Sequence, residues 1–204
     1  MRGIHRLGSR LLAAGSTIHT FTAQLADVDR GVYDDFTLRV ARHPSETALY
    51  MVTRLLAYCL EHDEGIAFSD GTSSTDEPAV LARDLTGKML AWIEVGAPDA
   101  ARLHFGSKSA ERVAVYTHRD PAKIAAPWAG KKIHRSDDIV FRGFERDFIA
   151  GAVAALERRN AVTFSTTVLC SRRSGLASSR FVTKKSIRGL GCISELSFTL
   201  RGSR

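Results

Sequence analysis

The 204-residue chain is 44% hydrophobic and 25% charged, a balance typical of a soluble globular protein of one domain. It has no apolar run long enough for a membrane helix, and its three widely spaced cysteines exclude a disulfide framework or zinc knuckle and favour a cytoplasmic protein. The net charge of +7 is uneven: 15 basic and 6 acidic residues follow Gly130, whereas 14 basic and 16 acidic residues make up the part that ends there. This asymmetry indicates either a polyanionic partner such as nucleic acid or a solvated basic face without a partner.

The N-terminal segment carries Arg2, Arg6 and Arg10 and no acidic residue. Its apolar stretch is too short for a secretory signal. We expect residues 1–16 to form a disordered extension, with an organellar presequence as the alternative. Residues 17–204 are expected to form a single α/β domain.

The first predicted elements are two strands and a helix. Polar and apolar residues alternate from Ile18 to Leu25 and again from Phe36 to Ala41, which predicts an antiparallel pair of strands. Apolar residues then recur every three or four positions from Pro44 to about residue 60, which predicts a helix that ends near Gly65. Residues 68–75 have the composition of a loop, and residues 79–83 are predicted to be a short helix.

The middle of the chain predicts a parallel pair of strands. The runs 90–95 and 113–117 are apolar and bounded by turn residues, as expected of buried strands. Residues 99–111 suit a crossover helix, so the two strands are expected to be parallel neighbours. A later helix over 144–158 precedes two further strands, 163–169 and 192–200.

Two isolated carboxylates stand at the ends of these elements. Glu46 is expected in the first turn of the predicted helix, where the helix dipole favours it and Arg42 or Arg54 is available as a partner. Glu94 lies inside an apolar strand, where a charged side chain is costly unless it binds a cation or accepts a hydrogen bond. The alternative to a metal-binding role is a purely structural ion pair between Glu94 and Arg54. If the carboxylates converge, they make a site for a hard divalent cation.

Several blocks of the sequence resemble the YaeQ family of bacterial proteins. The most specific are Arg-His-Pro-Ser-Glu-Thr at 42–47 and Trp-Ile-Glu-Val-Gly at 92–96. Further blocks match in order and spacing at 26–30, 54–57, 76–78, 84–87 and 115–117. The resemblance covers residues 18–117 and extends more loosely to residue 200.

The resemblance implies a restriction-endonuclease-like fold of the PD-(D/E)xK type, with a mixed β-sheet flanked by helices. It also implies one or two magnesium ions, which neutralise phosphate and generate the attacking nucleophile. Carried over by position, Glu46 is the helix carboxylate, Glu94 the strand carboxylate and Asp76 the preceding acid. Glu77 is the alternative to Asp76, and Asp84 is a third candidate.

The chain departs from the nuclease pattern at the basic residue. Gly96 stands where Glu-x-Lys requires lysine, as is usual in the family, and Phe105 replaces a helix residue that is commonly basic in its members. His104 or Lys108 is the candidate group for assisting the attacking water. An intact metal nuclease is therefore less expected for this chain than for its relatives.

The C-terminal third adds a basic segment suited to phosphate contact, formed by Arg172, Arg173, Arg180, Lys184, Lys185 and Arg188. Two functions from different classes follow. One is a magnesium-dependent phosphodiesterase acting on nucleic acid. The other is a non-catalytic protein on the same fold that binds nucleic acid or the transcription machinery. The third alternative is a small-molecule-binding or protein-interaction function in which the carboxylates are only structural. A monomer is the default oligomeric state.

Overall fold

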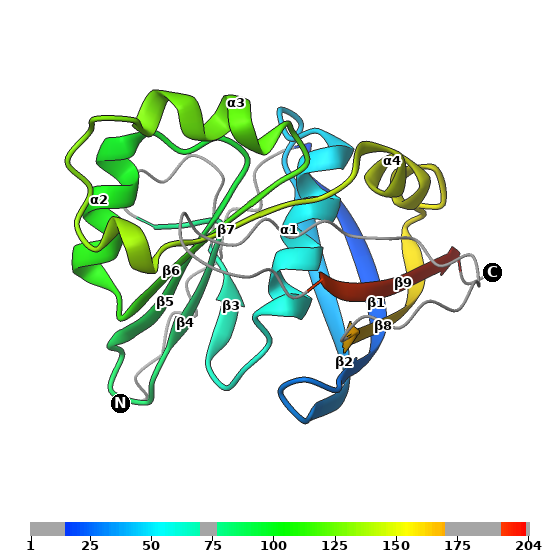
Figure 1. The fold of residues 1–204 in the computed structure, drawn as a ribbon. Helices are drawn as coiled ribbons and strands as arrows, with labels where there is room; N and C mark the ends of the chain where they lie inside the picture. Colours follow the sequence, from blue (N-terminus) through cyan, green and yellow to red (C-terminus); the bar gives the residue numbers. More distant parts are fainter. Residues whose placement is uncertain (1–14, 70–76, 170–192, 203–204) are drawn as a thin grey trace, which may run out of the picture.

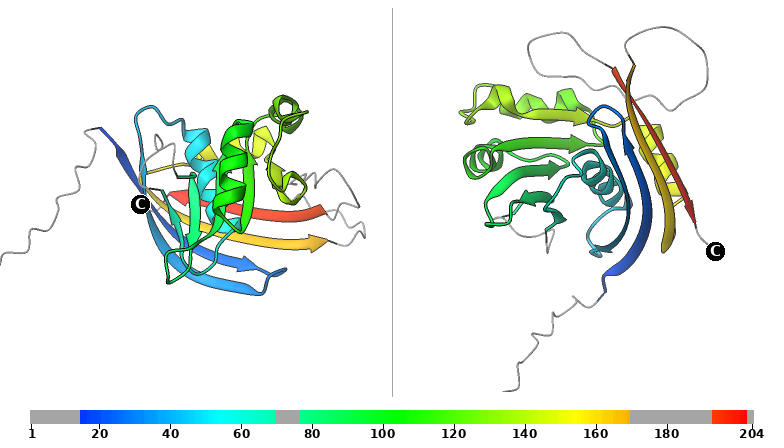
Figure 2. Two further views of the ribbon diagram at one scale, coloured as in Figure 1. Left: turned by 90° about the vertical axis from the view of Figure 1, so that its left-hand side faces the viewer. Right: turned by 90° about the horizontal axis from the view of Figure 1, so that it is seen from below.

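The computed structural model describes residues 15–69, 77–169 and 193–202 (Figure 1). Two β-sheets enclose one helix. The first sheet has the strand order β2-β1-β8-β9, and the second has the order β3-β4-β5-β6-β7. Helix α1 (Ala48–Leu60) lies between the two sheets (Figures 1 and 2).

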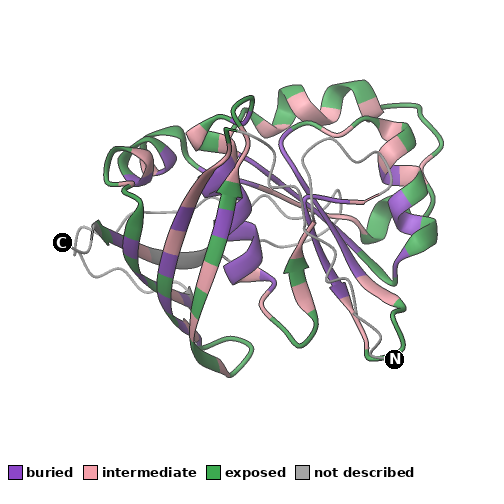
Figure 3. Ribbon diagram, turned by 180° about the vertical axis from the view of Figure 1, so that it is seen from behind, coloured by how far each residue is buried: buried purple, intermediate pink, exposed green. Residues whose placement is uncertain are grey.

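The first sheet contains β1 (Thr17–Asp27), β2 (Val32–Arg42), β8 (Arg159–Leu169) and β9 (Ile193–Gly202). The predicted antiparallel pairing of β1 with β2 is confirmed and runs in register from Thr17 opposite Arg42 to Asp27 opposite Val32. β8 then pairs with β1 in parallel, and β9 pairs with β8 antiparallel. The alternation predicted for β1 places Phe21, Ala23 and Leu25 in the core and exposes Thr22 and Gln24 (Figure 3).

The second sheet contains β3 (Ile66–Phe68), β4 (Val80–Arg83), β5 (Met89–Val95), β6 (Arg112–Thr117) and β7 (Val140–Gly143). β5 and β6 are parallel and are connected by α2 (Ala100–Ser109), as predicted. The prediction of a helix over 79–83 is wrong, because Val80 to Ala82 pair antiparallel with Ile93 to Ala91 of β5. Pairing with a neighbouring strand overrides the local propensity of so short a segment.

Three further helical segments follow β6: α3 (Pro121–Ala125), then the 3-10 turns 126–128 and 136–138. Helix α4 (Arg146–Ala154) packs beside α1 and is shorter than the predicted 144–158. Helix α1 also begins later than predicted. Thr47 is its N-cap, with the hydroxyl accepting from the Tyr50 N–H at 3.1 Å, so Pro44 and Glu46 lie in the turn before the helix.

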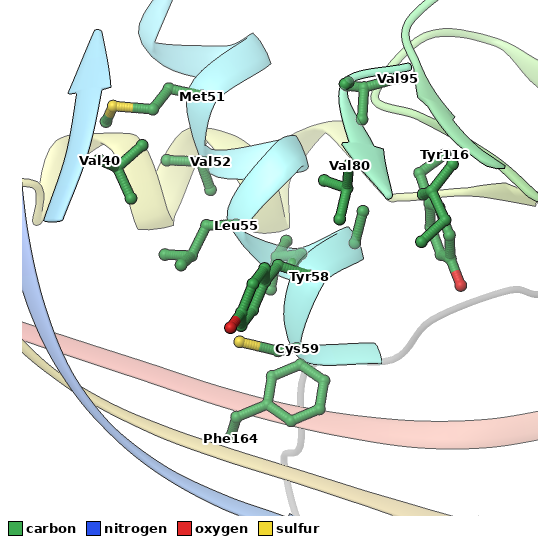
Figure 4. Close-up of a cluster of buried hydrophobic side chains, with 14 of the residues drawn as sticks. Val40, Met51, Val52, Leu55, Tyr58, Cys59, Val80, Val95, Tyr116 and Phe164 are labelled. Atoms are coloured by element: carbon green, nitrogen blue, oxygen red, sulfur yellow. The ribbon is translucent and has the colours of Figure 1, made fainter. Parts of the chain in front are cut away.

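The main core lies between the sheets, around α1. Leu55 of α1, Phe164 of the first sheet, and Val80 and Tyr116 of the second belong to this core, with α1 between the side chains of the two sheets (Figure 4). A smaller cluster on the other face of the second sheet includes Trp92 and is covered by α2. Strand β5 therefore faces helices on both sides, which explains its nearly continuous apolar sequence. Within the described ranges, no helix is long and apolar enough to span a membrane.

Candidate functional site

Glu46 is buried in the turn between β2 and α1 and is held by Arg54. The Arg54 Nη2 atom is 3.1 Å from Glu46 Oε1 and 3.3 Å from Oε2, and it also donates to the carbonyl of Ala41. The backbone N–H of His43 donates to Glu46 Oε2 at 3.3 Å. Burial raises the pKa of Glu46, and the charge of Arg54 offsets part of this effect. The expected pair with Arg54 is therefore present, whereas the expected place in the first helical turn is wrong.

Glu94 is buried on β5 and receives two donors on one oxygen. Trp92 Nε1 donates to Glu94 Oε1 at 2.6 Å, and Arg102 Nε of α2 lies 2.6 Å from the same oxygen. Burial raises the pKa of Glu94, partly offset by Arg102 and by the Trp92 hydrogen bond. The structural explanation expected for Glu94, a pair with Arg54, is wrong: α2 packs back onto β5 and supplies Arg102, while Arg54 serves Glu46.

The charges of both ion pairs act on Tyr50, in the first turn of α1. Burial raises the pKa of the Tyr50 hydroxyl, and the charges of Arg54, Arg102 and both glutamates act on it as well. The Tyr50 ring also approaches Gly96, where a Cβ built on the glycine would lie 3.6 Å from Cε2. Glu46 and Glu94 therefore act on the same tyrosine, and their convergence on a metal ion stays a prediction.

The other predicted acids are placed differently. Asp76 lies outside the described residues. Glu77 pairs through its half-exposed side chain with Arg83 at 3.3 Å, while its backbone carbonyl accepts from Arg102 Nη2 at 2.6 Å. Asp84 is a turn residue, because its Oδ1 accepts from the Thr86 N–H, the Thr86 hydroxyl and the Lys88 N–H. Asp84 is therefore committed to the β4–β5 turn.

The candidate basic residues lie on α2, and neither is an ion-pair partner of Glu46 or Glu94 in the described structure. His104 is half-buried, and its Nδ1 is buried without a hydrogen-bond partner in the described structure. Lys108 is exposed in the last turn of the helix.

Gly96 shows why a lysine is unsuited to the position after Glu94-Val95. Its φ is +96°, a backbone conformation that side chains with a Cβ rarely adopt. The turn directs the chain from β5 toward α2, while the Gly96 N–H donates to the Tyr116 carbonyl at 2.8 Å. A lysine there would strain the turn, so this position is unsuited to the basic residue of the nuclease pattern.

Carboxylate oxygens are the ligands that magnesium prefers, and Glu46 and Glu94 fit such an ion in kind. Both acids already have arginine partners, however, and the two donors to Glu94 both reach Oε1. Among the described residues there is no group of three or more His, Cys, Asp or Glu side chains arranged to hold a metal ion. A complete magnesium site would therefore need a further ligand and a shift of at least one arginine.

Sequence reasoning missed two residues of this site, Arg102 and Tyr50. Arg102 has a signal in retrospect: the helix after a buried strand packs back onto that strand, so a cation in its first turn can reach a carboxylate there. Asp99 fixes the start of α2 by accepting from the Arg102 N–H at 2.7 Å. Tyr50 had no comparable signal.

The predicted basic residues Arg172, Arg173, Lys184 and Lys185 lie outside the described residues.

Comparison with known proteins identifies relatives along most of the chain. A family model described as YaeQ protein matches residues 12–169. Proteins named "Uncharacterized protein YaeQ" are 41% identical in Escherichia coli (strain K12) and 40% identical in Salmonella typhi, each over 112 residues, or 54% of this chain. These matches span 61% of the length of each relative.

Two solved structures share the fold. The YaeQ protein from Pseudomonas syringae is 32% identical, with a TM-score of 0.67 over 75% of this chain and 85% of that one. The YaeQ protein from Xanthomonas axonopodis pv. citri is 24% identical, with a TM-score of 0.68 over 93% of this chain and 99% of that one. The arrangement of two sheets around α1 is thus shared with experimentally determined structures.

Proposed function

The chain belongs to the YaeQ family, and from this premise we propose that it is a divalent-metal-dependent phosphodiesterase acting on nucleic acid, on a restriction-endonuclease-like core. The observation that carries the proposal is that two buried carboxylates, Glu46 from the entry to α1 and Glu94 from β5, both raise the pKa of the same residue, Tyr50. Burial raises the pKa of both carboxylates despite their arginine partners, so keeping them ionised is costly, which supports a role for the pair.

In this proposal Glu94 and Glu46 hold the metal. The ion would neutralise a scissile phosphate and lower the pKa of a bound water. The chain's own groups would do the rest. Arg102 is partly exposed, with its side chain 26% accessible, so it can exchange Glu94 for a phosphate oxygen. His104 or Lys108 remains the proposed group for assisting the water, with Asp76 as a third carboxylate.

A second function is favoured by Gly96. Because its positive φ excludes the lysine of the nuclease pattern, and because both carboxylates have arginine partners, the same surface suits binding of nucleic acid without cleavage. In that case Glu94 positions the partly exposed Arg102 for contact with a phosphate, while the buried Arg54 holds Glu46. The two functions differ in whether metal binding and cleavage depend on Glu94.

Calorimetry with magnesium and with manganese tests the first function. We expect a saturable heat with the wild-type protein that is lost in Glu94→Gln and kept in the control Glu111→Gln, which changes an exposed glutamate paired with Lys88. Absence of heat from the wild type would overturn the metal-dependent proposal.

Cleavage of single- and double-stranded DNA and RNA is then assayed with the same proteins. Nucleic-acid binding that survives Glu94→Gln without any cleavage would support the second function.

A further inference from the structure

A large cavity of the described structure is lined by residues other than those of the candidate site. Its volume of about 1050 Å³ is at the upper end of small-molecule sites. It is bounded by the segment after β6, by α3 and by β7, and Leu103 of α2 also lines it. Two aromatic residues form part of the wall, Trp128 and Phe141, whose rings meet edge to face at 5.0 Å. The cavity therefore offers flat apolar surfaces to a planar ligand.

The polar end of the cavity is fixed by His118. The Thr53 hydroxyl donates its single hydrogen to the Leu49 carbonyl at 2.7 Å, so it must accept from His118 Nδ1, which lies 3.1 Å away. Burial lowers the pKa of His118 and favours the neutral ring. In that tautomer Nε2 is an acceptor, and it forms no hydrogen bond with any described residue. The cavity thus presents a free acceptor to an N–H group of a ligand.

Both basic and acidic side chains line the cavity. Arg119, Lys131 and Arg146 line the cavity and form no ion pair with other described residues. Asp137 and Glu145 also line it, and Asp120 does so while capping α3 through the Ala122 N–H. Cations suit a phosphate, and the carboxylates, like His118 Nε2, accept from ring or exocyclic N–H groups.

The cavity is continuous with the elements that carry the candidate site. His118 contacts Thr53, the residue before Arg54, and Leu103 follows Arg102 directly. A nucleotide whose phosphate contacts the partly exposed Arg102 would therefore have its base close to this cavity.

We propose that the cavity bounded by Trp128, Phe141 and His118 binds a nucleobase, either of a free nucleotide or of an unpaired nucleotide in a strand. Flat aromatic walls would accept any base by stacking, and the His118 acceptor would contact its N–H edge. The inference rests on the proposed function for the class of ligand. It requires neither metal nor cleavage.

Tryptophan fluorescence tests the proposal in a buffer that contains EDTA. We expect saturable quenching by nucleoside 5′-monophosphates and binding of ribose 5-phosphate that is weaker by about tenfold or more, because stacking of the base is absent. Ala125→Phe, which fills the cavity, should abolish the response, as should Ala122→Phe on the same helix. The control Ala150→Phe places the same side chain at an exposed position of α4. Thermal melting checks that each variant is folded.

Three results would overturn the proposal: no saturable response to any nucleotide, equal affinity for ribose 5-phosphate, or unchanged binding in both folded filling variants. A short oligonucleotide that binds more tightly than the mononucleotide assigns the base to a strand, and equal affinity assigns it to a free nucleotide. Because EDTA removes divalent metal, base binding with no calorimetric response to magnesium would separate this inference from the proposed metal chemistry.

Discussion

Glu94 illustrates how a single residue sets the electrostatics of the site. Its Oε1 accepts a hydrogen bond from Trp92 of the same strand and forms an ion pair with Arg102 of the following helix. The Glu94 side chain is almost fully buried. Burial nevertheless outweighs both donors and raises its pKa above the ordinary value of 4.5. Ionised Glu94 is therefore held at a cost to the folded state, which is a common property of functional carboxylates.

A pH-dependent stability follows for Glu94→Gln. Because the folded pKa is raised, the folded state binds more protons than the unfolded state just above pH 4.5, and wild-type stability falls as pH rises through the folded pKa. Gln does not titrate, so this loss is absent from the variant. The loss of the counter-charge to Arg102 applies only where wild-type Glu94 is ionised, and it is already included in the direction of the pKa shift.

The measurement is urea unfolding of both proteins from pH 4.5 to neutrality. We expect the stability advantage of the wild type over Glu94→Gln to shrink as pH rises. Glu46 and Asp27 titrate in both proteins, so their contributions cancel in the difference. A wild-type advantage that grows with pH would mean that Arg102 and Trp92 outweigh burial, contrary to the raised pKa.

At the scale of elements, the contact between α2 and β5 positions Arg102. Gly106 packs on the Trp92 indole so closely that a Cβ would lie 2.6 Å from Cδ1. The absence of a side chain lets the helix approach the strand, and Arg102, one turn earlier, then reaches Glu94. Gly106 thus allows the Arg102–Glu94 ion pair to form by letting α2 approach β5.

Gly106→Ala should destabilise the protein by about 1 to 3 kcal/mol, because overpacking against Trp92 exceeds the gain of about 1 kcal/mol in helix propensity. Gly151→Ala in α4 is the matched control. A Cβ there meets nothing within 4 Å, so we expect a gain of about 0.5 to 1 kcal/mol. Chemical unfolding of the two variants measures both effects. Equal stabilisation by the two substitutions would show that α2 does not depend on close contact at Gly106.

The elements differ in how far sequence predicts them. The β1–β2 pair and the β5–α2–β6 unit were predictable because their partners are adjacent in the chain and their hydrophobic patterns are regular. The parallel pairing of β1 with β8 places Thr20 opposite Arg159, far away in the chain. Such a pairing has no signal in the local sequence pattern, so the division into two sheets was not predicted. Strand β4 was missed for the same reason, since its conformation depends on β5.

The candidate site was predictable in part. Glu46 and Glu94 were identified from the sequence, and both are buried and act electrostatically on Tyr50. Their partners were harder to assign, because Arg54 was equally available to both acids until α2 placed Arg102 on Glu94. The choice between His104 and Lys108 stays a prediction, since neither meets the carboxylates in the described part of the chain.

At the scale of the whole molecule, charge is separated along the sequence. The residues after Gly130 carry 15 basic and 6 acidic side chains, whereas the carboxylates of the candidate site lie in the more acidic part. A basic segment attached to an acidic site would position a polyanion by contacts to its phosphates and leave the chemistry to the site. Each such contact releases counterions, so binding should weaken as salt rises.

Replacing Arg172, Arg173, Lys184 and Lys185 by Ser tests this arrangement. If all four contact phosphates, the slope of log affinity against log salt should become shallower by about 3, and affinity should fall similarly for unrelated sequences. The control replaces four exposed basic residues of the described part, Arg39, Lys123, Lys132 and Arg158, and removes the same net charge. Fluorescence anisotropy with a labelled oligonucleotide at several salt concentrations measures both slopes. Equal losses in the two variants would show that net charge alone attracts the nucleic acid and that the segment has no specific part in positioning it.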